Sequence, residues 1–177
     1  MTEKNIKTAT DLFWDSRPSD AQSPQKVNID DIVQTKVECN FIEKFLRKDK
    51  TLLEVGCGNG NLSTWLSERV SNVVAFDYSD NMIQQARRVN QRENVEFHVD
   101  NLLELKEVNK GKYDLVLCVR VLINLSSFDQ QVQALRNLSN IMNKGAKLIL
   151  IEGFSDGFQE LDKVRDSVGL KKLVPAR

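Results

Sequence analysis

The sequence has 177 residues and is electrically balanced, with 25 Lys and Arg residues against 25 Asp and Glu residues. This length fits one domain with a substantial hydrophobic core. A net charge of zero argues against the broad basic surface that binds nucleic acids or an anionic membrane.

The sequence also lacks the signals of a membrane or secreted protein. No apolar run approaches the roughly 20 residues that a membrane helix needs, and the opening MTEKNIKTATDLFW has no apolar centre typical of a secretory signal. The three cysteines are far apart and have no CxxC spacing, which predicts reduced thiols rather than a disulfide frame or zinc site. We therefore expect a cytoplasmic protein without a metal site.

The chain divides into a polar arm, residues 1–27, and one regular domain, residues 28–177. The arm holds two of the three prolines and many Ser, Asp and Gln residues, so we expect it to be rich in loops. It also carries Phe13 and Trp14, an aromatic pair that a plain linker would not need.

The domain opens with an amphipathic helix that has Asn28 or Asp30 near its N-cap. Its apolar side chains recur four residues apart, at Ile29, Val33, Val37, Phe41 and Phe45, with Ile42 and Leu46 beside the last two. Short apolar runs then alternate with helical stretches: TLLEV, NVVAF, VEFHV, YDLVLCV and KLILIE are the predicted strands. This alternation predicts a doubly wound α/β fold, in which helices cover both faces of a mostly parallel sheet of about five strands.

A glycine-rich turn follows the first strand, in the run LLEVGCGNGNLS. Gly56, Gly58 and Gly60 allow positive φ and close approach of a ligand, and such turns often hold an anion at the start of a helix. The spacing is GxGxG rather than the dinucleotide pattern GxGxxG. Glu54, two residues before the first glycine, suits a ligand with a positive amine better than a pyrophosphate. A plain turn would need only one glycine.

Acidic residues end the next two strands. Asp77 is predicted to accept hydrogen bonds from ribose hydroxyls, because Ser79 and Asp80 are better placed to cap the helix that follows. Tyr78 and Met82 could sandwich a flat base, although a Met at helical spacing is as often core. Asp100, followed by Asn101, could accept a hydrogen bond from the amine of adenine or could cap a loop.

These features together resemble the class I S-adenosylmethionine-dependent methyltransferases. The similarity runs from about Thr51 to Glu152 and includes NKGAKLILIE, where Gly145 keeps the first glycine of the family's KPGG turn. The resemblance implies that the methionine part of S-adenosylmethionine is lined by Glu54 and the three glycines. It places the ribose at Asp77 and the adenine at Asp100 and Asn101. Cys118, near the tip of the fourth strand, would line the cofactor site as a small filler rather than a nucleophile.

In this family the end of the fourth strand faces the transferred methyl group. Here it reads LCVRVLINL, without the (D/N)PPY or Pro-Cys motifs of nucleic-acid methyltransferases, so we expect a small-molecule or glycan-precursor acceptor and no nucleic acid. Arg120 could bind an anionic group of the acceptor or form a surface ion pair. Asn124 could orient the acceptor or cap the turn. His98, the only histidine, lies inside a strand and is expected to be structural rather than a general base.

The two ends of the chain shape the remaining expectations. In the arm, FWDSRP resembles the N-terminal cover of many such enzymes, with Trp14 excluding water and Arg17 gripping an anionic acceptor. The family's sheet has the order 3-2-1-4-5-7-6, but after the fifth strand too few residues remain for the last antiparallel hairpin. We therefore expect the order 3-2-1-4-5, a truncated domain, and an open sheet edge through which the chain could form an oligomer.

Three functions fit the sequence. The first is methyl transfer from S-adenosylmethionine to an O or N atom of a small molecule or sugar-containing precursor. The second is a non-catalytic, methyltransferase-like module that binds the cofactor or a partner, which the short C-terminus favours. The third is an NAD-dependent oxidoreductase, against which the glycine spacing and Glu54 argue.

Overall fold

The computed structural model describes residues 32–172, and these contain a sheet of five parallel strands. The strand order is β3-β2-β1-β4-β5, which confirms the predicted order. Each predicted apolar run forms a strand: β1 (Thr51–Val55), β2 (Asn72–Asp77), β3 (Val95–Val99), β4 (Tyr113–Val119) and β5 (Met142–Ile151). The arm, with Trp14 and Arg17, lies outside the described residues.

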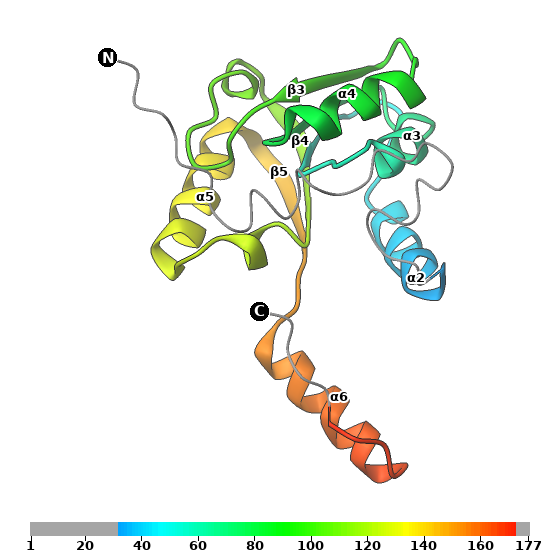
Figure 1. The fold of residues 1–177 in the computed structure, drawn as a ribbon. Helices are drawn as coiled ribbons and strands as arrows, with labels where there is room; N and C mark the ends of the chain where they lie inside the picture. Colours follow the sequence, from blue (N-terminus) through cyan, green and yellow to red (C-terminus); the bar gives the residue numbers. More distant parts are fainter. Residues whose placement is uncertain (1–31, 173–177) are drawn as a thin grey trace.

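Helices flank the sheet on both faces (Figure 1). The helices α2 (Ile32–Glu43), α3 (Asn61–Ser67) and α4 (Asp80–Val89) pack on one face, and α5 (Phe128–Ile141) packs on the other. Short 3₁₀ turns lie at η2 (Val108–Lys110) and η3 (Leu122–Asn124). Ser79 and Ser127 cap α4 and α5, because each side chain accepts a backbone N–H from the first turn.

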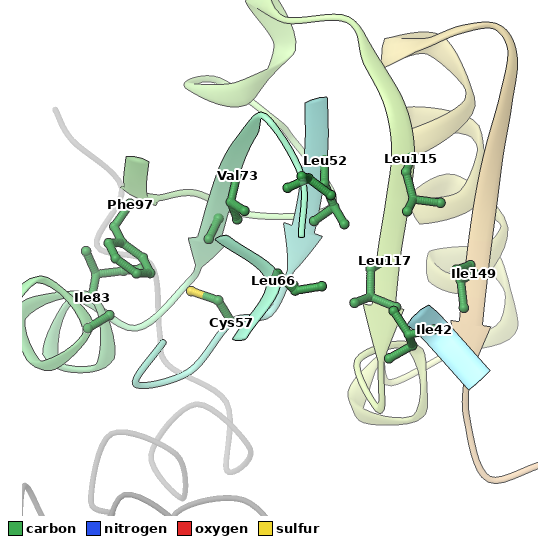
Figure 2. Packing of buried hydrophobic residues seen from close by; sticks show 13 residues of the cluster. Ile42, Leu52, Cys57, Leu66, Val73, Ile83, Phe97, Leu115, Leu117 and Ile149 are labelled. Carbon is green, nitrogen blue, oxygen red and sulfur yellow. The ribbon is translucent and has the colours of Figure 1, made fainter. Parts of the chain in front are cut away.

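The core has two layers, one on each face of the sheet. Figure 2 shows the first, where Leu52, Leu117 and Ile149 from the strands meet Ile42 of α2 and Leu66 of α3. The second layer packs α5 against the opposite face, and its members are completely or almost completely buried: Leu53, Val55, Phe76, Val116 and Leu138. Burial of both strand faces explains why the strands read as continuous apolar runs.

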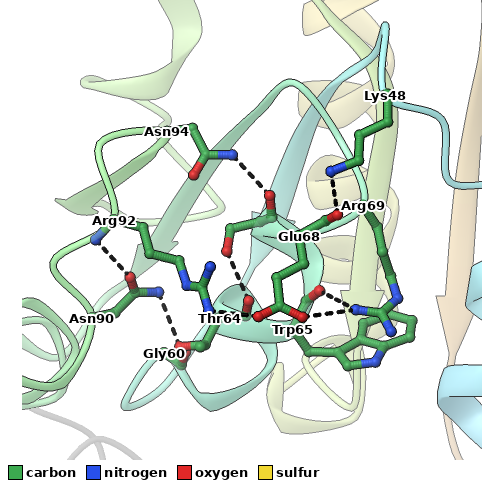
Figure 3. Close-up of polar contacts among 10 residues, drawn as sticks. Lys48, Gly60, Thr64, Trp65, Glu68, Arg69, Asn90, Arg92 and Asn94 are labelled. Carbon is green, nitrogen blue, oxygen red and sulfur yellow. Dashed lines mark hydrogen bonds and ion pairs between the residues drawn. The ribbon is translucent and has the colours of Figure 1, made fainter.

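Side-chain hydrogen bonds tie α3 to the connection between α4 and β3 (Figure 3). The Asn90 amide donates to the Thr64 hydroxyl over 3.0 Å, and the Asn94 amide donates to the Ser67 carbonyl over 2.9 Å. These bonds satisfy polar groups near the C-terminal end of a seven-residue helix. They therefore fix the short helix that begins directly after the glycine turn.

β5 begins at Met142, directly after α5 and before the predicted start at Lys147. Tyr113 pairs with Met142 and Leu115 with Lys147, so a register shift absorbs the intervening residues. Gly145 lies within the shift with φ of 82°. The predicted glycine turn is therefore an irregularity inside the strand, of the kind that allows one strand to carry extra residues.

The predicted amphipathic helix exists, but only the C-terminal part of its predicted apolar face meets the core, through Ile42, Phe45 and Leu46. Val33, Val37 and Phe41 are 71%, 63% and 46% exposed, whereas Ile42 is fully buried. Ile29 lies outside the described residues. The difference arises because α2 contributes only Ile42 to the core, and Phe45 packs against the same cluster from beyond the end of the helix.

The last helix, α6 (Ser155–Ser167), projects away from the body of the domain (Figure 1). None of its residues is buried. Phe154, just before the helix, and Leu161 within it are 56% and 48% exposed. β5 is the last strand in the sheet order, and no strand follows it among the described residues.

Helices α5 and α6 should differ sharply in what they contribute to stability. Leu138→Ala removes a fully buried side chain from the second core layer and should lower the free energy of unfolding by about 2–5 kcal/mol. Leu161→Ala, the matched change on α6, should alter it by less than about 0.5 kcal/mol. Urea titrations followed by fluorescence measure both, and equal losses would contradict the exposed position of α6.

Candidate functional site

The carboxyl ends of β1, β2 and β4 meet at one edge of the sheet. Val55, the last residue of β1, pairs with Phe76 of β2 and with Cys118 of β4. The segments that follow these strands are therefore neighbours, although they lie far apart in the sequence. Open α/β sheets bind ligands at such an edge, where the strand order reverses.

The glycine turn after β1 has three glycines with positive φ: 66° at Gly56, 54° at Gly58 and 75° at Gly60. Space is also limited, because a Cβ atom on Gly56 would lie 2.4 Å from Cγ2 of Val121. A Cβ on Gly60 would lie 2.9 Å from the side chains of Ala86 and Phe97. Both backbone conformation and close packing therefore require glycine, which explains why the turn carries more than one.

Asp77 links the glycine turn to the start of α4. Its carboxylate accepts the N–H of Gly58 over 2.9 Å through one oxygen and the N–H of Ser79 over 3.0 Å through the other. The side chain of Ser79 in turn accepts the N–H of Met82, so Ser79 is the helix cap, as predicted. Asp77, only 8% exposed, thus organises the strand tips.

Glu54 lies buried beneath the glycine turn, with 3% of its surface exposed. The Ser63 hydroxyl of α3 donates a hydrogen bond to its carboxyl over 2.5 Å. Burial raises the pKa of Glu54 to about 8, and the nearby charge of Asp77 adds to the rise, while the bond from Ser63 opposes it. The carboxyl group is therefore largely protonated at neutral pH. Ser63 had no predicted role, because its position on α3 gives no pattern in the sequence.

Asp100 shapes the loop after β3. Its two oxygens accept four backbone N–H groups over 2.8–3.0 Å, those of Asn101, Lys106, Glu107 and Val108. Burial raises the pKa of Asp100, but the four donors outweigh burial and hold it below the ordinary value. A carboxylate accepts about four hydrogen bonds, so these contacts support the loop-capping alternative.

The other predicted cofactor-lining residues differ in exposure. Tyr78 is 40% exposed at the tip of β2, whereas Met82 is 3% exposed on α4. Cys118 is fully buried in the second core layer, and burial, aided by the charge of Glu152, raises the pKa of its thiol to about 12. Burial also raises the pKa of Cys57 well above its ordinary value. Neither thiol suits a nucleophile.

The turn after β4 is held by local bonds. The Arg120 guanidinium forms an ion pair with Glu38 of α2, and the Asn124 amide donates to the Arg120 carbonyl over 2.8 Å. The ion-pair and turn-capping alternatives are thus the arrangements found for these two side chains. Glu152, which had no predicted role, accepts backbone N–H groups from this turn. Its position at the end of a predicted strand was the only signal in the sequence.

His98 lies on the edge strand β3, with its Nε2 3.6 Å from a carboxylate oxygen of Glu96. In the sheet, β2 separates β3 from β1, which leads into the glycine turn. A structural role for His98 stays a prediction. Within residues 32–172, no cluster of three His, Cys, Asp or Glu side chains could hold a metal ion. In the same range, none of the helices has the length and apolar character needed to cross a membrane.

The sequence of residues 52–145, more than half the chain, matches the methyltransferase domain family. The chain therefore belongs to this family. It is 31% identical to the ubiquinone biosynthesis O-methyltransferase of Hydrogenovibrio crunogenus over 121 residues, which cover 67% of this chain and 47% of that protein. It is 30% identical to the ribosomal protein L11 methyltransferase of Thermosipho melanesiensis over 124 residues, which cover 69% of this chain and 45% of that protein. The chain thus spans less than half the length of these relatives.

Among solved structures, the fold resembles the N-methyltransferase NodS from Bradyrhizobium japonicum WM9, which was crystallised with S-adenosylhomocysteine. The TM-score is 0.69 at 17% sequence identity, and the match covers 81% of this chain and 72% of that chain. This similarity supports the Rossmann-like methyltransferase fold with five parallel strands.

Replacing Glu54 by Gln should change how stability depends on pH. Between about pH 4.5 and 8 the unfolded chain ionises Glu54 while the folded chain keeps it protonated, so its contribution to stability falls as pH rises, by up to about 1.4 kcal/mol per unit. Glu54→Gln removes this loss, so the free energy of unfolding of the variant should rise relative to that of the wild type from pH 5 to 8. Urea unfolding at several pH values, with exposed Glu107→Gln as control, measures the difference. A difference independent of pH would contradict the assignment.

Proposed function

We propose that this chain binds S-adenosylmethionine and transfers its methyl group to an O or N atom of a small molecule or sugar-containing precursor. The observation that carries the proposal is the glycine turn, in which Gly58 is held by Asp77 while Glu54 lies buried beneath. This arrangement suits a nucleoside with a positive amine and no phosphate. Family membership and the fold shared with NodS support the same cofactor.

Asp77 is suited to the ribose. Each of its oxygens accepts one backbone N–H, from Gly58 or Ser79. The carboxylate lies at the tip of β2, the position from which an acidic residue accepts hydrogen bonds from ribose hydroxyls in dinucleotide-binding folds, and its bonds to Gly58 and Ser79 hold it there. The same bonds fix the direction of the carboxylate before the ligand arrives, which lowers the entropic cost of binding.

Glu54 and the glycines are suited to the methionine part. A buried carboxyl group with a raised pKa releases its proton more readily when a positive group comes near. The amine and sulfonium of S-adenosylmethionine carry such charge. The bare backbone of Gly56 and Gly58 leaves room for this part of the ligand, with no side chain to exclude it.

The adenine is assigned to the loop after β3. Because the Asp100 carboxylate already holds four N–H groups, we propose that it acts by shaping the loop, while Asn101 and exposed Tyr78 lie nearer the base. Met82 would contribute through packing beneath the start of α4. Cys118 would act only as a filler behind the site.

The methyl donor supplies an activated carbon that an acceptor lone pair can attack in line. The contribution of the chain is therefore mainly to position the two reactants. Arg120 and Asn124, in the turn after β4, lie on the side where the acceptor would enter, with Trp14 and Arg17 of the arm as further candidates. We propose that the protein is cytoplasmic and that its acceptor is a small molecule or glycan precursor. The names of the two relatives cover both a ubiquinone biosynthesis O-methyltransferase and a ribosomal protein methyltransferase.

A non-catalytic module is the second candidate. It is favoured by the exposed apolar residues of α6 and by the position of β5, which is an edge strand of the sheet formed by the described residues. Such a chain would bind the cofactor, or associate through the open edge of β5, without turning over an acceptor.

Isothermal titration of S-adenosylmethionine and S-adenosylhomocysteine into the purified chain tests the proposal, with NAD as the control for an oxidoreductase. We expect micromolar binding of the first two ligands and none of NAD. Binding of NAD alone would contradict the proposed function. Binding of the nucleosides without methylation of any offered acceptor would favour the non-catalytic module.

Asp77→Asn should lower the affinity for S-adenosylhomocysteine by about 100-fold. The reason is that the amide nitrogen is a donor, and it would stand where a carboxylate oxygen accepts a backbone N–H from Gly58 or Ser79 and a hydroxyl of the ribose. Asp80→Asn, on the exposed first turn of α4, is the matched control and should bind like the wild type. Calorimetry gives both affinities, and circular dichroism verifies the fold. Wild-type affinity in the Asp77 variant would exclude the ribose contact.

A further inference from the structure

The turn after β4 has an unusual backbone that needs support from elsewhere. Arg120 has a left-handed conformation with φ of 54°, which is costly for a residue with a side chain. The 3₁₀ turn η3 follows two residues later. On the β5 side, the N–H of Arg120 donates to the carbonyl of Ile151 over 2.7 Å. The turn is thus attached to the end of β5.

The carboxylate of Glu152 provides the main support. One oxygen accepts the N–H groups of Val121 and Leu122, each over 2.9 Å, and the other accepts the N–H of Ile123 over 3.3 Å. The first N–H groups of a helical turn have no partner within the turn, so this side chain satisfies three of them together. Glu152 follows β5 directly and belongs to neither core layer.

The same turn touches the glycine turn. The 2.4 Å separation between a Cβ built on Gly56 and Cγ2 of Val121 shows that this valine methyl lies directly against the Gly56 backbone. A shift of the β4 turn would therefore move the wall of the glycine turn. Val121 thus links the two groups, since its N–H donates to Glu152 and its methyl group lies against Gly56.

We propose that Glu152 is a positioning residue: it holds the turn of residues 120–124 against the glycine turn and thereby fixes the wall of the nucleoside site on its methyl-donor side. The inference rests on the proposed function for the identity of the ligand. It does not rest on that function for the contacts, which belong to the chain alone.

The role requires a carboxylate rather than a side chain of similar shape. In Glu152→Gln the amide oxygen can still accept two N–H groups, but the amide nitrogen faces a third donor and cannot accept it. One backbone N–H of the turn then loses its partner. Glu160→Gln on α6 makes the same change of charge at an exposed position and is the matched control.

Two-dimensional ¹H–¹⁵N NMR spectra of the ligand-free chain test the contacts. Glu152→Gln should shift the amide resonances of Val121, Ile123 and Gly56. It should leave Gly58 unchanged, because Asp77 holds that N–H independently. General loss of structure would move all resonances, whereas unchanged resonances at both Val121 and Gly56 would overturn the proposal.

Titration of S-adenosylhomocysteine into the same three proteins tests the consequence. We expect the affinity of Glu152→Gln to fall about 10-fold, with Glu160→Gln equal to the wild type. Shifted resonances with wild-type affinity would overturn the positioning role and leave Glu152 as a cap of the turn alone. Failure of the wild type to bind would contradict the proposed function, while the ligand-free spectra would still decide whether Glu152 sets the position of Gly56.

Discussion

The hydrogen bond between the N–H of Gly58 and the carboxylate of Asp77 is the contact on which the candidate site depends. It joins the turn after β1 to the tip of β2, and the second oxygen of Asp77 joins both to the start of α4. The parallel register brings these groups together, since Val55 lies beside Phe76, directly before Asp77. A side chain buried at a strand tip can therefore orient three backbone segments and present acceptor atoms at their common edge.

Two acidic groups lie close together at this edge, and they differ in charge. Asp77 accepts two backbone N–H groups, whereas Glu54 receives one hydroxyl donor and is buried more deeply. Isolated buried charge is costly, so Glu54 retains its proton until about pH 8. The fold can therefore place an acid under the glycine turn without a permanent buried charge. A cationic ligand would favour ionisation of the Glu54 carboxyl group when it binds.

The sequence predicted the strands well, because TLLEV and YDLVLCV are apolar on both faces and end at polar turns. It also predicted the glycine turn and the cap at Ser79, whose signals are local. It left open whether Asp100 caps its loop, and it did not predict that Glu152 supports the turn after β4, because the bonds of Glu152 depend on how distant segments meet. The apolar face of α2 was only partly confirmed for a related reason: periodicity shows an apolar stripe but not how much of it the rest of the fold covers.

The exposed helix α6 makes the domain thermodynamically heterogeneous. A helix of 13 residues without a buried side chain is stabilised by little more than its own backbone bonds and capping, which leave short helices marginal in water. It should therefore interconvert between helix and coil independently of the cooperative melting of the sheet. Any partner that covers its apolar side chains would supply the free energy that the sheet does not, and folding of this segment would then be coupled to association.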